Sequence, residues 1–317
     1  MKIRYLVILL VILSITSIFL GVSQISIFDI FSLTEDQKNI LLNSRIPRLM
    51  SILIAGASMS VAGSIMQQLS KNKFVSPTTA GTLDSAKLGI LVSMMLFTSA
   101  SSFQKITLSF IFALLGTFVF MKLLEKIKFK DAIFIPLVGL VFGNIIDSTS
   151  TFFAYKNDLI QNMTSWLQGD FSMIMTGNYE LMFVSIPVLI IAYRFASQFT
   201  AAGMGEDFSV NLGINYRRVV NIGLIIVALV TASVVLSVGV IPFLGLIIPN
   251  IVTIYRGDHL KSTLIHTALL GAVFLLACDI IGRVVIYPYE IPISLTVGVI
   301  GSGIFIYLLL RRNKYGL

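Results

Sequence analysis

Long apolar runs recur along almost the whole chain and constrain its fold more than any other feature. A helix that crosses a bilayer needs about 20 consecutive, mostly apolar residues, and the 317 residues accommodate ten such segments with short connections. Only 12% of the residues are charged, which is about half the share in soluble domains. We therefore predict an all-α, polytopic membrane protein whose single transmembrane domain covers residues 1–317. The ten helices are expected at 5–22, 46–67, 81–99, 104–123, 132–154, 179–196, 218–238, 242–255, 265–286 and 292–310.

The first apolar run has an alternative interpretation as a cleaved signal peptide. It extends from Tyr5 to Val22 behind Lys2 and Arg4, and a basic start also precedes signal peptides. Its apolar core is longer than the roughly 7 to 15 residues of a signal peptide, and no A-x-A cleavage site follows. We therefore interpret this run as the first spanning helix, with its N-terminus inside the cell.

The distribution of positive charge indicates which helix ends face the cytoplasm. Ten spans place both termini on one side; sixteen of the 23 lysines and arginines then fall on that side, six on the other and Lys87 within a span. Cytoplasmic loops carry an excess of Lys and Arg, so both termini are expected to be cytoplasmic. Arg45 and Arg48, on either side of Pro47, are exceptions at the outer start of the second span. Their side chains either extend outward to lipid headgroups or serve a docking function.

The residue content disfavours several functional classes. The net charge of +8 would suit nucleic-acid binding, but the basic residues lie between apolar runs, where the positive-inside effect accounts for them. The single cysteine, Cys278, and the histidines His259 and His266 match none of the common metal-binding spacings. The stretch GTLDSAKLG lacks the second glycine and the hydroxyl residue of a phosphate-binding loop. We expect no cofactor, no nucleic-acid partner and no enzymatic activity; ATP hydrolysis would belong to a separate chain.

The inner loop at 197–217 is expected to contain a short amphipathic helix. Phe208 and Leu212 are four residues apart and share one face, Val210 lies between them in the sequence, and Gly213 can end the helix. An apolar stripe on a surface helix is stable when another apolar surface shields it from water. The lipid interface and a partner protein are the two candidates.

The outer loop at 155–178 contains the only tryptophan, Trp166, among apolar neighbours. This composition predicts an interfacial or re-entrant segment. Tryptophan is enriched at membrane interfaces, so Trp166 either anchors this loop at the interface or contributes to a ligand site.

Small residues crowd the second span between Ala55 and Ser64 and recur in GVIGSG at 298–303. Such residues let helix backbones approach closely in a bilayer. Close packing is the favoured interpretation, and the lining of a translocation path is the alternative.

Ionisable residues inside the expected spans are functional candidates, because a charge within a bilayer is costly. Asp279 and Arg283 are four residues apart on one helical face and can pair. The pair would be structural or, alternatively, part of a proton relay.

Two further acidic residues lie within expected spans. Asp147 is in the middle of its span with Asn144 one turn earlier, and no local cation is evident for it. Both are candidates for the lining of a water-filled pathway, and burial of the carboxyl in the bundle is the alternative for Asp147. Asp84 and Lys87, near the inner end of the third span, are expected to neutralise each other.

Three ordered blocks resemble permease subunits of the FecCD/BtuC type, the membrane domains of ABC importers for iron–siderophore complexes and vitamin B12. The first block is RIPRLMSILIAGASMSVAGSIMQQLSKNKFVSPTTAG, the second is GEDFSVNLGINYRRV, and the third extends from GVIPFLGLIIPN at 239 to residue 312. The resemblance covers nearly the whole chain. It implies a BtuC-like type II ABC importer fold in a bacterial cytoplasmic membrane.

The resemblance also implies roles for individual positions. Arg45 and Arg48 match the family's R-x-P-R pair, which meets acidic residues of the substrate-binding protein. Asn72 and Phe74 match a segment that contributes to the inner gate, and Asp279 and Arg283 match the family's D-x-x-x-R pair. The family's cytoplasmic coupling loop, which sits in a groove of the ATPase, corresponds to about 197–218, with matching residues Gly205, Glu206, Asp207, Leu212, Gly213, Arg217 and Arg218.

Departures from the family pattern bear on the substrate. NKFVSP replaces the usual N-P-L-A-x-P, with Lys73 in place of a proline, and Pro249-Asn250 replaces P-H in the eighth span. Asp84 and Lys87 stand within the usual G-x-S-x-G-A stretch. The variant NKFVSPTTAGT is similar to permeases for catecholate or mixed catecholate siderophores of the petrobactin type, which implies import of such a ferric siderophore.

The implied assembly contains a second permease chain, identical or homologous, two ABC ATPase subunits, a substrate-binding lipoprotein and the surrounding lipid. Alternatives are import of another metal chelate, such as haem or cobalamin, by the same mechanism, or ion-coupled secondary transport. In the latter case Asp147 or Asp279 would be the coupling carboxyl.

Overall fold

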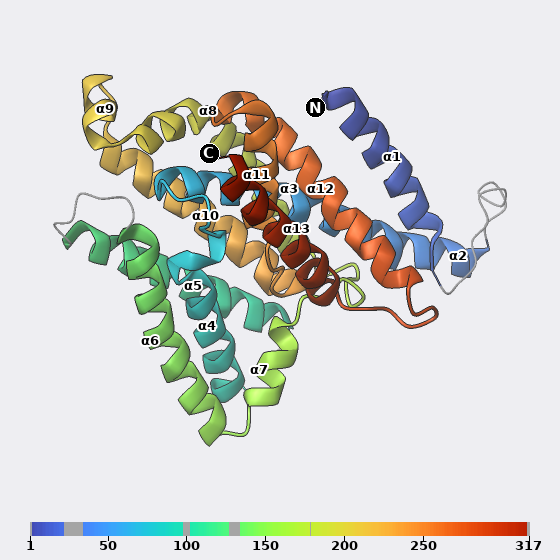
Figure 1. Cartoon of the computed structure of the whole chain (residues 1–317). Helices are drawn as coiled ribbons and strands as arrows, with labels where there is room; N and C mark the ends of the chain where they lie inside the picture. Colours follow the sequence, from blue (N-terminus) through green and yellow to red (C-terminus); the bar gives the residue numbers. More distant parts are fainter. Residues whose placement is uncertain (1, 22–33, 98–101, 127–133, 178, 316–317) are drawn as a thin grey trace.

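The computed structural model describes residues 2–21, 34–97, 102–126, 134–177 and 179–315, which form helices joined by short connections (Figure 1). Within these ranges no β-strand occurs, and one isolated bridge joins Gln168 to Val240. The prediction of an all-α protein is confirmed. The long helices are α1 (Ile3–Phe19), α3 (Ile46–Leu69), α4 (Thr82–Leu96), α5 (Ser102–Lys126), α6 (Phe134–Lys156), α8 (Ser185–Met204), α10 (Tyr216–Val238), α11 (Leu244–Arg256), α12 (Leu260–Val284) and α13 (Ile293–Tyr315). The short ones are α2 (Glu35–Ile40), α7 (Ile160–Leu167) and α9 (Glu206–Asn211).

Each of the ten predicted spans overlaps one of the long helices. Among the described residues, six segments are long and apolar enough to cross a membrane, which confirms the polytopic character: Glu35–Leu69, Gln104–Leu124, Ile135–Lys156, Glu180–Met204, Tyr216–Val238 and Leu260–Val284. Three apolar helices are shorter, at Ile3–Phe19, Leu244–Arg256 and Ile293–Leu308, and α4 has 15 residues. The number of spans and the side of the termini stay predictions. Lys128 and Lys130, which entered the charge count, lie outside the described residues.

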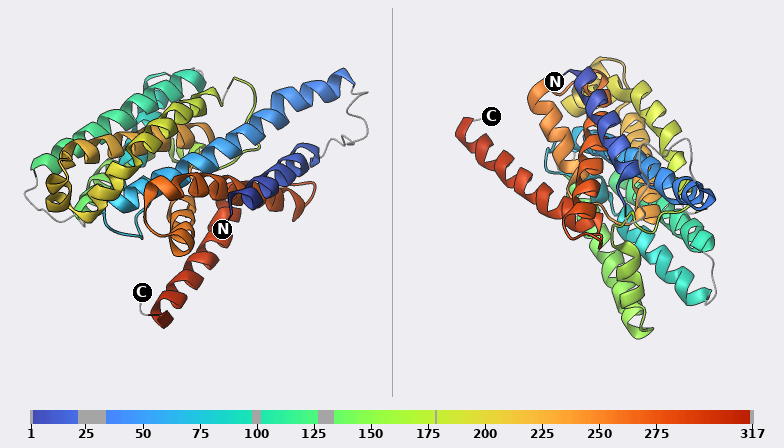
Figure 2. Two further views of the ribbon diagram at one scale, coloured as in Figure 1. Left: turned by 90° about the horizontal axis from the view of Figure 1, so that it is seen from above. Right: turned by 90° about the vertical axis from the view of Figure 1, so that its right-hand side faces the viewer.

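The helix that contains Arg45 and Arg48 begins eleven residues earlier than the predicted start at Ile46. Thr34 caps α2 through a capping box with Gln37, and a π-helical turn, Leu41–Arg45, joins α2 to α3. Proline has no N–H and therefore leaves a carbonyl four residues earlier without its helical donor. Here the Asn43 carbonyl accepts a hydrogen bond of 3.1 Å from the Thr176 N–H instead. The wide turn and this external donor let the helix pass through Pro47. Figure 2 shows α2 and α3 as one continuous blue helix.

α3 forms the centre of the bundle and contacts α8, α10, α11 and α12. A Cβ on Gly56 would come within 2.7 Å of the Gly271 carbonyl oxygen on α12, and a Cβ on Gly63 would come within 1.8 Å of the Gly245 carbonyl oxygen on α11. These glycines therefore allow backbones to touch, as small residues do between membrane helices. The small residues between Ala55 and Ser64 are buried except for Ala57, in agreement with the packing interpretation.

α4, α5 and α6 pack on one another at the side of this centre (Figure 1). Only 22% of the most apolar window of α6 is buried within the chain, compared with 83% for the segment that contains α3. In a membrane, such exposed surface faces lipid or another subunit. α13 also leans away from the rest of the bundle (Figure 2).

Alternating helix directions gather the candidate residues at two ends of the bundle. One end contains the start of α3, the end of α12 and α7, and we call it the α7 end. The other end contains α9, between the end of α8 and the start of α10 (Figure 1), and we call it the α9 end.

Candidate functional site

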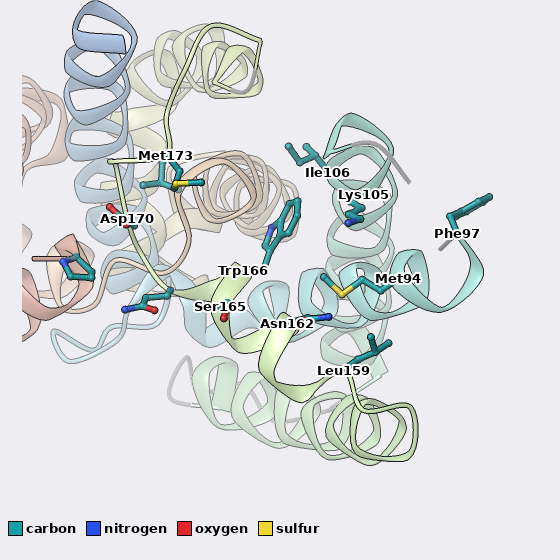
Figure 3. A pocket seen from close by; sticks show the side chains of 13 residues that line it. Met94, Phe97, Lys105, Ile106, Leu159, Asn162, Ser165, Trp166, Asp170 and Met173 are labelled. Atoms are coloured by element: carbon teal, nitrogen blue, oxygen red, sulfur yellow. The ribbon is translucent and has the colours of Figure 1, made fainter. Parts of the chain in front are cut away.

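A cavity of about 670 Å³ opens at the α7 end. Its lining comes from the end of α4, the start of α5, α7 and the segment after it, the last residue of α10 and the connection before α13 (Figure 3). Trp166 and Lys105 both line it, and the Lys105 ammonium lies 5.6 Å from the centre of the Trp166 ring. The structure thus places Trp166 at a cavity. From the sequence, an interfacial anchor and a ligand site were equally good interpretations of this residue. Lys105 was missed because it lies 61 positions before Trp166 in the sequence.

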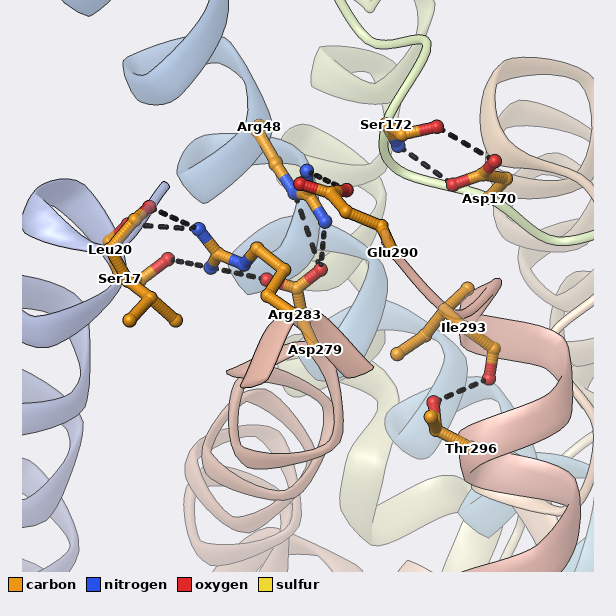
Figure 4. Close-up of polar contacts among 10 residues, drawn as sticks. All are labelled: Ser17, Leu20, Arg48, Asp170, Ser172, Asp279, Arg283, Glu290, Ile293 and Thr296. Carbon is orange, nitrogen blue, oxygen red and sulfur yellow. Dashed lines mark hydrogen bonds and ion pairs between the residues drawn. The ribbon is translucent and has the colours of Figure 1, made fainter. Parts of the chain in front are cut away.

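Arg48 is held within the chain by two carboxylates at the same end (Figure 4). Its Nε and Nη2 donate to Asp279 Oδ1 at 3.2 and 2.7 Å, and its Nη1 donates to Glu290 Oε2 at 2.7 Å. The side chains of Arg48, Asp279 and Glu290 are 14%, 3% and 30% exposed. If Arg48 docks a partner protein, it does so while it is bound to Asp279 and Glu290. The charge pattern of the sequence did not indicate these internal contacts. Glu290 was missed, although it is the only acid in the stretch VVIYPYEIPIS.

Asp279 and Arg283 form an ion pair, with Arg283 Nη2 2.5 Å from Asp279 Oδ2. Both side chains are almost completely buried. Arg283 Nη1 also donates to the carbonyl oxygens of Ser17 and Leu20, at 3.0 and 3.1 Å. The pair therefore connects α12 to the last turn of α1 in addition to balancing charge.

Arg45 contacts the same end of α1. Its Nη1 donates to the Ile18 carbonyl oxygen at 2.6 Å. The last carbonyls of a helix have no partners within it, and cationic donors satisfy them well. Arg45 and Arg283 thus both donate hydrogen bonds to carbonyl oxygens at the end of α1. Neither interpretation of Arg45 from the sequence, headgroup binding or docking, predicted this contact.

The α9 end presents the predicted amphipathic helix. Glu206 and Asp207 lie in the first turn of α9, where negative charge complements the helix dipole. Phe208, Val210 and Leu212 are 45–60% exposed and have no cover in the described part of the chain. The buried Ser209 hydroxyl ties α9 to the end of α8 through bonds to the carbonyls of Ala201 and Gly205.

Two glycines and an asparagine cap bound the part of the predicted coupling loop that contains α9. Gly205 and Gly213 adopt positive φ values of 123° and 71°, which glycine tolerates without strain. The Asn215 side chain accepts from the Arg218 N–H at 3.0 Å and caps α10. Arg217 and Arg218 are exposed beside α9.

The inner-gate candidates lie in the connection after α3. The Asn72 side chain accepts from the Phe74 N–H at 2.9 Å. The Phe74 ring, 44% exposed, lies edge-on against Phe305 of α13, with centroids 6.0 Å apart. The connection is therefore anchored by a local turn and by contact with another helix.

Two departures from the family pattern contact each other here. Asn250 Nδ2 donates to the Lys73 carbonyl oxygen at 2.8 Å, and the Lys73 ammonium pairs with Asp258 in the connection between α11 and α12. Lys73 and Asn250 thus act together in attaching the connection after α3 to α11.

Lys87 does not form an ion pair with Asp84, although its positive charge still acts on the Asp84 carboxyl. Lys87 Nζ instead lies 2.5 Å from Asp147 Oδ1 on α6, so Asp147 does have a cation partner. Asp84 packs against α6 as well, since a Cβ on Gly143 would come within 2.3 Å of Asp84 Oδ2. Helix packing determined that Lys87 pairs with Asp147 and not with Asp84, and spacing along the sequence does not reveal this packing. Asn144 lies one turn before Asp147, on the exposed side of α6.

In the described ranges, no three His, Cys, Asp or Glu side chains lie together as a metal site would require. A helical bundle with close-packed small residues, a cavity at one end and an uncovered amphipathic helix at the other has the features of a membrane transport subunit. The chain belongs to the FecCD transport family, whose model matches residues 9–311.

Known proteins that resemble this chain include siderophore permeases. It is 65% identical to the petrobactin import system permease protein YclN of Bacillus subtilis, over 99% of this chain and 100% of the relative. It is 39% identical to the ferric-anguibactin transport system permease protein FatD of Vibrio anguillarum, over 94% and 95%. A solved structure of a metal-chelate type ABC transporter in an inward-facing conformation has the same fold, with a TM-score of 0.85, 22% identity and coverage of 97% and 98%.

Proposed function

We propose that this chain is the transmembrane permease subunit of an ATP-driven ABC importer for a ferric siderophore of the catecholate, petrobactin type in a bacterial cytoplasmic membrane. The observation that carries the proposal is the 65% identity to a petrobactin import permease over almost the whole of both chains. A second petrobactin import permease, FatD of Bacillus anthracis, is 37% identical over 97% of this chain. The stretch NKFVSPTTAGT supports the same substrate class.

The proposed topology has ten spanning helices in a single domain, with both termini in the cytoplasm. It is supported by the overlap of ten helices with ten apolar segments and by the excess of basic residues on the terminal side. In this orientation the α7 end faces outward and the α9 end faces the cytoplasm.

The proposed mechanism is alternating access without covalent chemistry in this chain. A second permease, identical or homologous, completes the pathway; a lipoprotein delivers the ferric siderophore and two ATPase subunits supply the energy. ATP binding biases the bundle between two arrangements, as a ligand that favours one state does. Candidates for the pathway and inner gate are Asn72, Phe74, Asn144 and Asp147.

Receptor docking is assigned to the outward end, at Arg45 and Arg48. Arg48 already binds Glu290, so an acidic residue of the receptor would compete with Glu290 for the same guanidinium. An exposed ion pair contributes about 0–1 kcal/mol and favours association rate and register. Such weak contacts suit a receptor that must dock, deliver and leave.

ATPase coupling is assigned to the cytoplasmic end, along about 197–218. The exposed apolar side chains of α9 form a surface that a groove of the ATPase can bury. A displacement of α9 would reach α8 through the hydrogen bond from the Ser209 hydroxyl. The segment comprises Gly205, Glu206, Asp207, Leu212, Gly213, Arg217 and Arg218.

Reconstitution of the permease, its ATPase and its lipoprotein in vesicles tests the proposal. Uptake of iron-labelled ferric petrobactin should require ATP, stop with an ATPase variant that cannot hydrolyse it, and continue after collapse of the proton gradient. Uptake that depends on the gradient and not on the ATPase would assign the chain to secondary transport. Uptake of haem or cobalamin alone would keep the class and overturn the substrate.

A further inference from the structure

The cavity at the α7 end has the size of a small-molecule site. Its volume of about 670 Å³ falls within the roughly 300 to 1,000 Å³ typical of such sites. Its lining combines the apolar side chains of Met94, Phe97 and Ile106 with polar groups of Asn162 and Ser165. An apolar wall with a few polar groups is characteristic of ligand sites.

The described lining residues carry one charge of each sign, and the positive one lies beside the Trp166 ring (Figure 3). Among the described residues that line the cavity, Lys105 is the only cation and Asp170 is the only acid. Both Asp170 carboxylate oxygens accept hydrogen bonds from Ser172, at 2.8 Å from its N–H and 2.7 Å from its hydroxyl. Across the described residues, no carboxylate lies within ion-pair distance of Lys105. The ammonium is therefore able to bind an anion that enters.

The aromatic wall beside Lys105 is held in place by its helix. Met163, one turn before Trp166 on α7, is buried with Leu91 and Ala154 of α4 and α6. At the end of α7 the Leu167 carbonyl accepts from the Val240 N–H at 2.9 Å. Trp166 is thus presented at the cavity from a helix anchored in its middle and at its end (Figure 3).

We propose that this cavity is a transient acceptor site for an anionic, aromatic iron chelate, in which Lys105 binds the chelate's oxygens and Trp166 stacks on its ring. The assignment rests on the proposed function, and it narrows the substrate to a chemical class. A catecholate carries adjacent anionic oxygens on an aromatic ring, so one group can engage both side chains. Met94 and Met173 supply further sulfur contacts, which aromatic rings favour.

The site provides selection without holding the chelate tightly. It opens at the outward end, which also contains the Arg48 network, so the chelate would reach it on leaving the receptor. A single ammonium in a hydrated cavity binds weakly, and the chelate can therefore move on. An uncharged chelate without aromatic donors would lose both contacts.

Direct binding is measurable because Trp166 is the only tryptophan of the chain. In the purified full chain, ferric petrobactin should quench Trp166 fluorescence, and an uncharged ferric hydroxamate should quench it less. Lys105→Gln should raise the half-quenching concentration about threefold to tenfold, as expected for loss of a charge-assisted contact, and Lys105→Arg should keep it. Equal quenching by both chelates, or no effect of Lys105→Gln, would overturn the assignment.

Transport separates this site from receptor docking. With the reconstituted complex, Lys105→Gln and Trp166→Leu should lower the maximal uptake rate of ferric petrobactin and leave the half-saturating concentration of loaded lipoprotein unchanged. Lys122→Gln is the matched control, since Lys122 lies over the Phe118 ring at 5.3 Å on the same helix and outside the cavity. Wild-type rates in both cavity variants would overturn this assignment alone, whereas an inactive wild-type complex would overturn the proposed function.

Discussion

Arg48 and Asp279 meet through two hydrogen bonds to one carboxylate oxygen, although 231 positions separate them in the chain. The other oxygen of Asp279 pairs with Arg283 at 2.5 Å. One nearly buried carboxylate thus binds two guanidinium groups and joins α3 to α12, and Glu290 supplies the second negative charge that balances them. This relationship makes Asp279 the centre of the network at the α7 end, with Glu290 as its more exposed second acid.

Replacement of Asp279 by alanine should destabilise the protein strongly. Removal of one partner from a buried ion pair costs about 3–5 kcal/mol, because the remaining charge stays buried without compensation. Thermal unfolding in detergent should show a markedly lower midpoint. Glu35→Ala, which breaks the exposed pair with Lys38 at 2.8 Å, is the control and should cost at most about 1 kcal/mol. Equal midpoints for the two variants would contradict this role of Asp279.

Replacement of Glu290 by glutamine should strengthen receptor docking. The change removes a competing carboxylate from Arg48 and leaves the buried bonds to Asp279 intact. The half-saturating concentration of loaded lipoprotein should fall about twofold to fivefold, in line with an exposed ion pair, and less at high salt. Arg48→Glu is less informative, because it also breaks the contact with Asp279.

Glu35→Gln provides the charge-matched control for Glu290→Gln. It removes one negative charge from the exposed start of α2, away from the carboxylates that bind Arg48. If both variants change docking equally, net charge explains the effect. No change in Glu290→Gln would contradict the proposed competition.

Changes in α9 should uncouple ATP hydrolysis from transport. Glu206→Arg reverses charge in the first turn of α9, and Leu212→Ser removes an apolar side chain that is 57% exposed. We expect normal membrane levels but loss of receptor-stimulated ATPase activity and uptake, measured in vesicles. Leu42→Ser, at a position 61% exposed outside the coupling segment, should retain both. Unchanged stimulation in Glu206→Arg would refute the coupling assignment.

Replacement of Gly63 by alanine should disrupt the contact between α3 and α11. The added Cβ would come within 1.8 Å of a backbone oxygen, so the helices must separate; overpacking costs about 1–3 kcal/mol. The yield of monodisperse protein and its unfolding midpoint should both fall. Gly303→Ala on α13, where a Cβ would meet nothing within 4 Å, should leave both unchanged. A normal midpoint for Gly63→Ala would show that the contact adapts.

Replacement of Asp147 by asparagine should leave ATP-driven uptake at about half of the wild-type rate or more. The pair with Lys87 is partly exposed, and the amide still accepts a hydrogen bond, so structure should be retained. If Asp147 instead coupled transport to an ion gradient, the neutral side chain would abolish uptake. Rates measured with and without the proton gradient separate these outcomes.

Local sequence patterns by themselves determined the elements of this protein. Apolar runs predicted the positions of the long helices because a bilayer-length helix satisfies its own backbone hydrogen bonds. The α9 helix and its end at Gly213, and the pairing of Asp279 with Arg283 four residues later, also depend on neighbours within one or two turns. The start of the second predicted helix was missed, since the donor that compensates Pro47 comes from Thr176 in a distant loop.

Only the tertiary structure decided which distant residues meet. Lys87 pairs with Asp147 instead of Asp84, Arg48 binds Asp279 and Glu290, and Lys105 lies over Trp166. Each of these contacts joins different helices or connections. Spacing along one helix specifies which face a side chain occupies, but the rotation and contact of two helices depend on how their small and large residues interlock. The sequence therefore determined which segments are helical and where charged groups lie on them, and helix packing determined their partners.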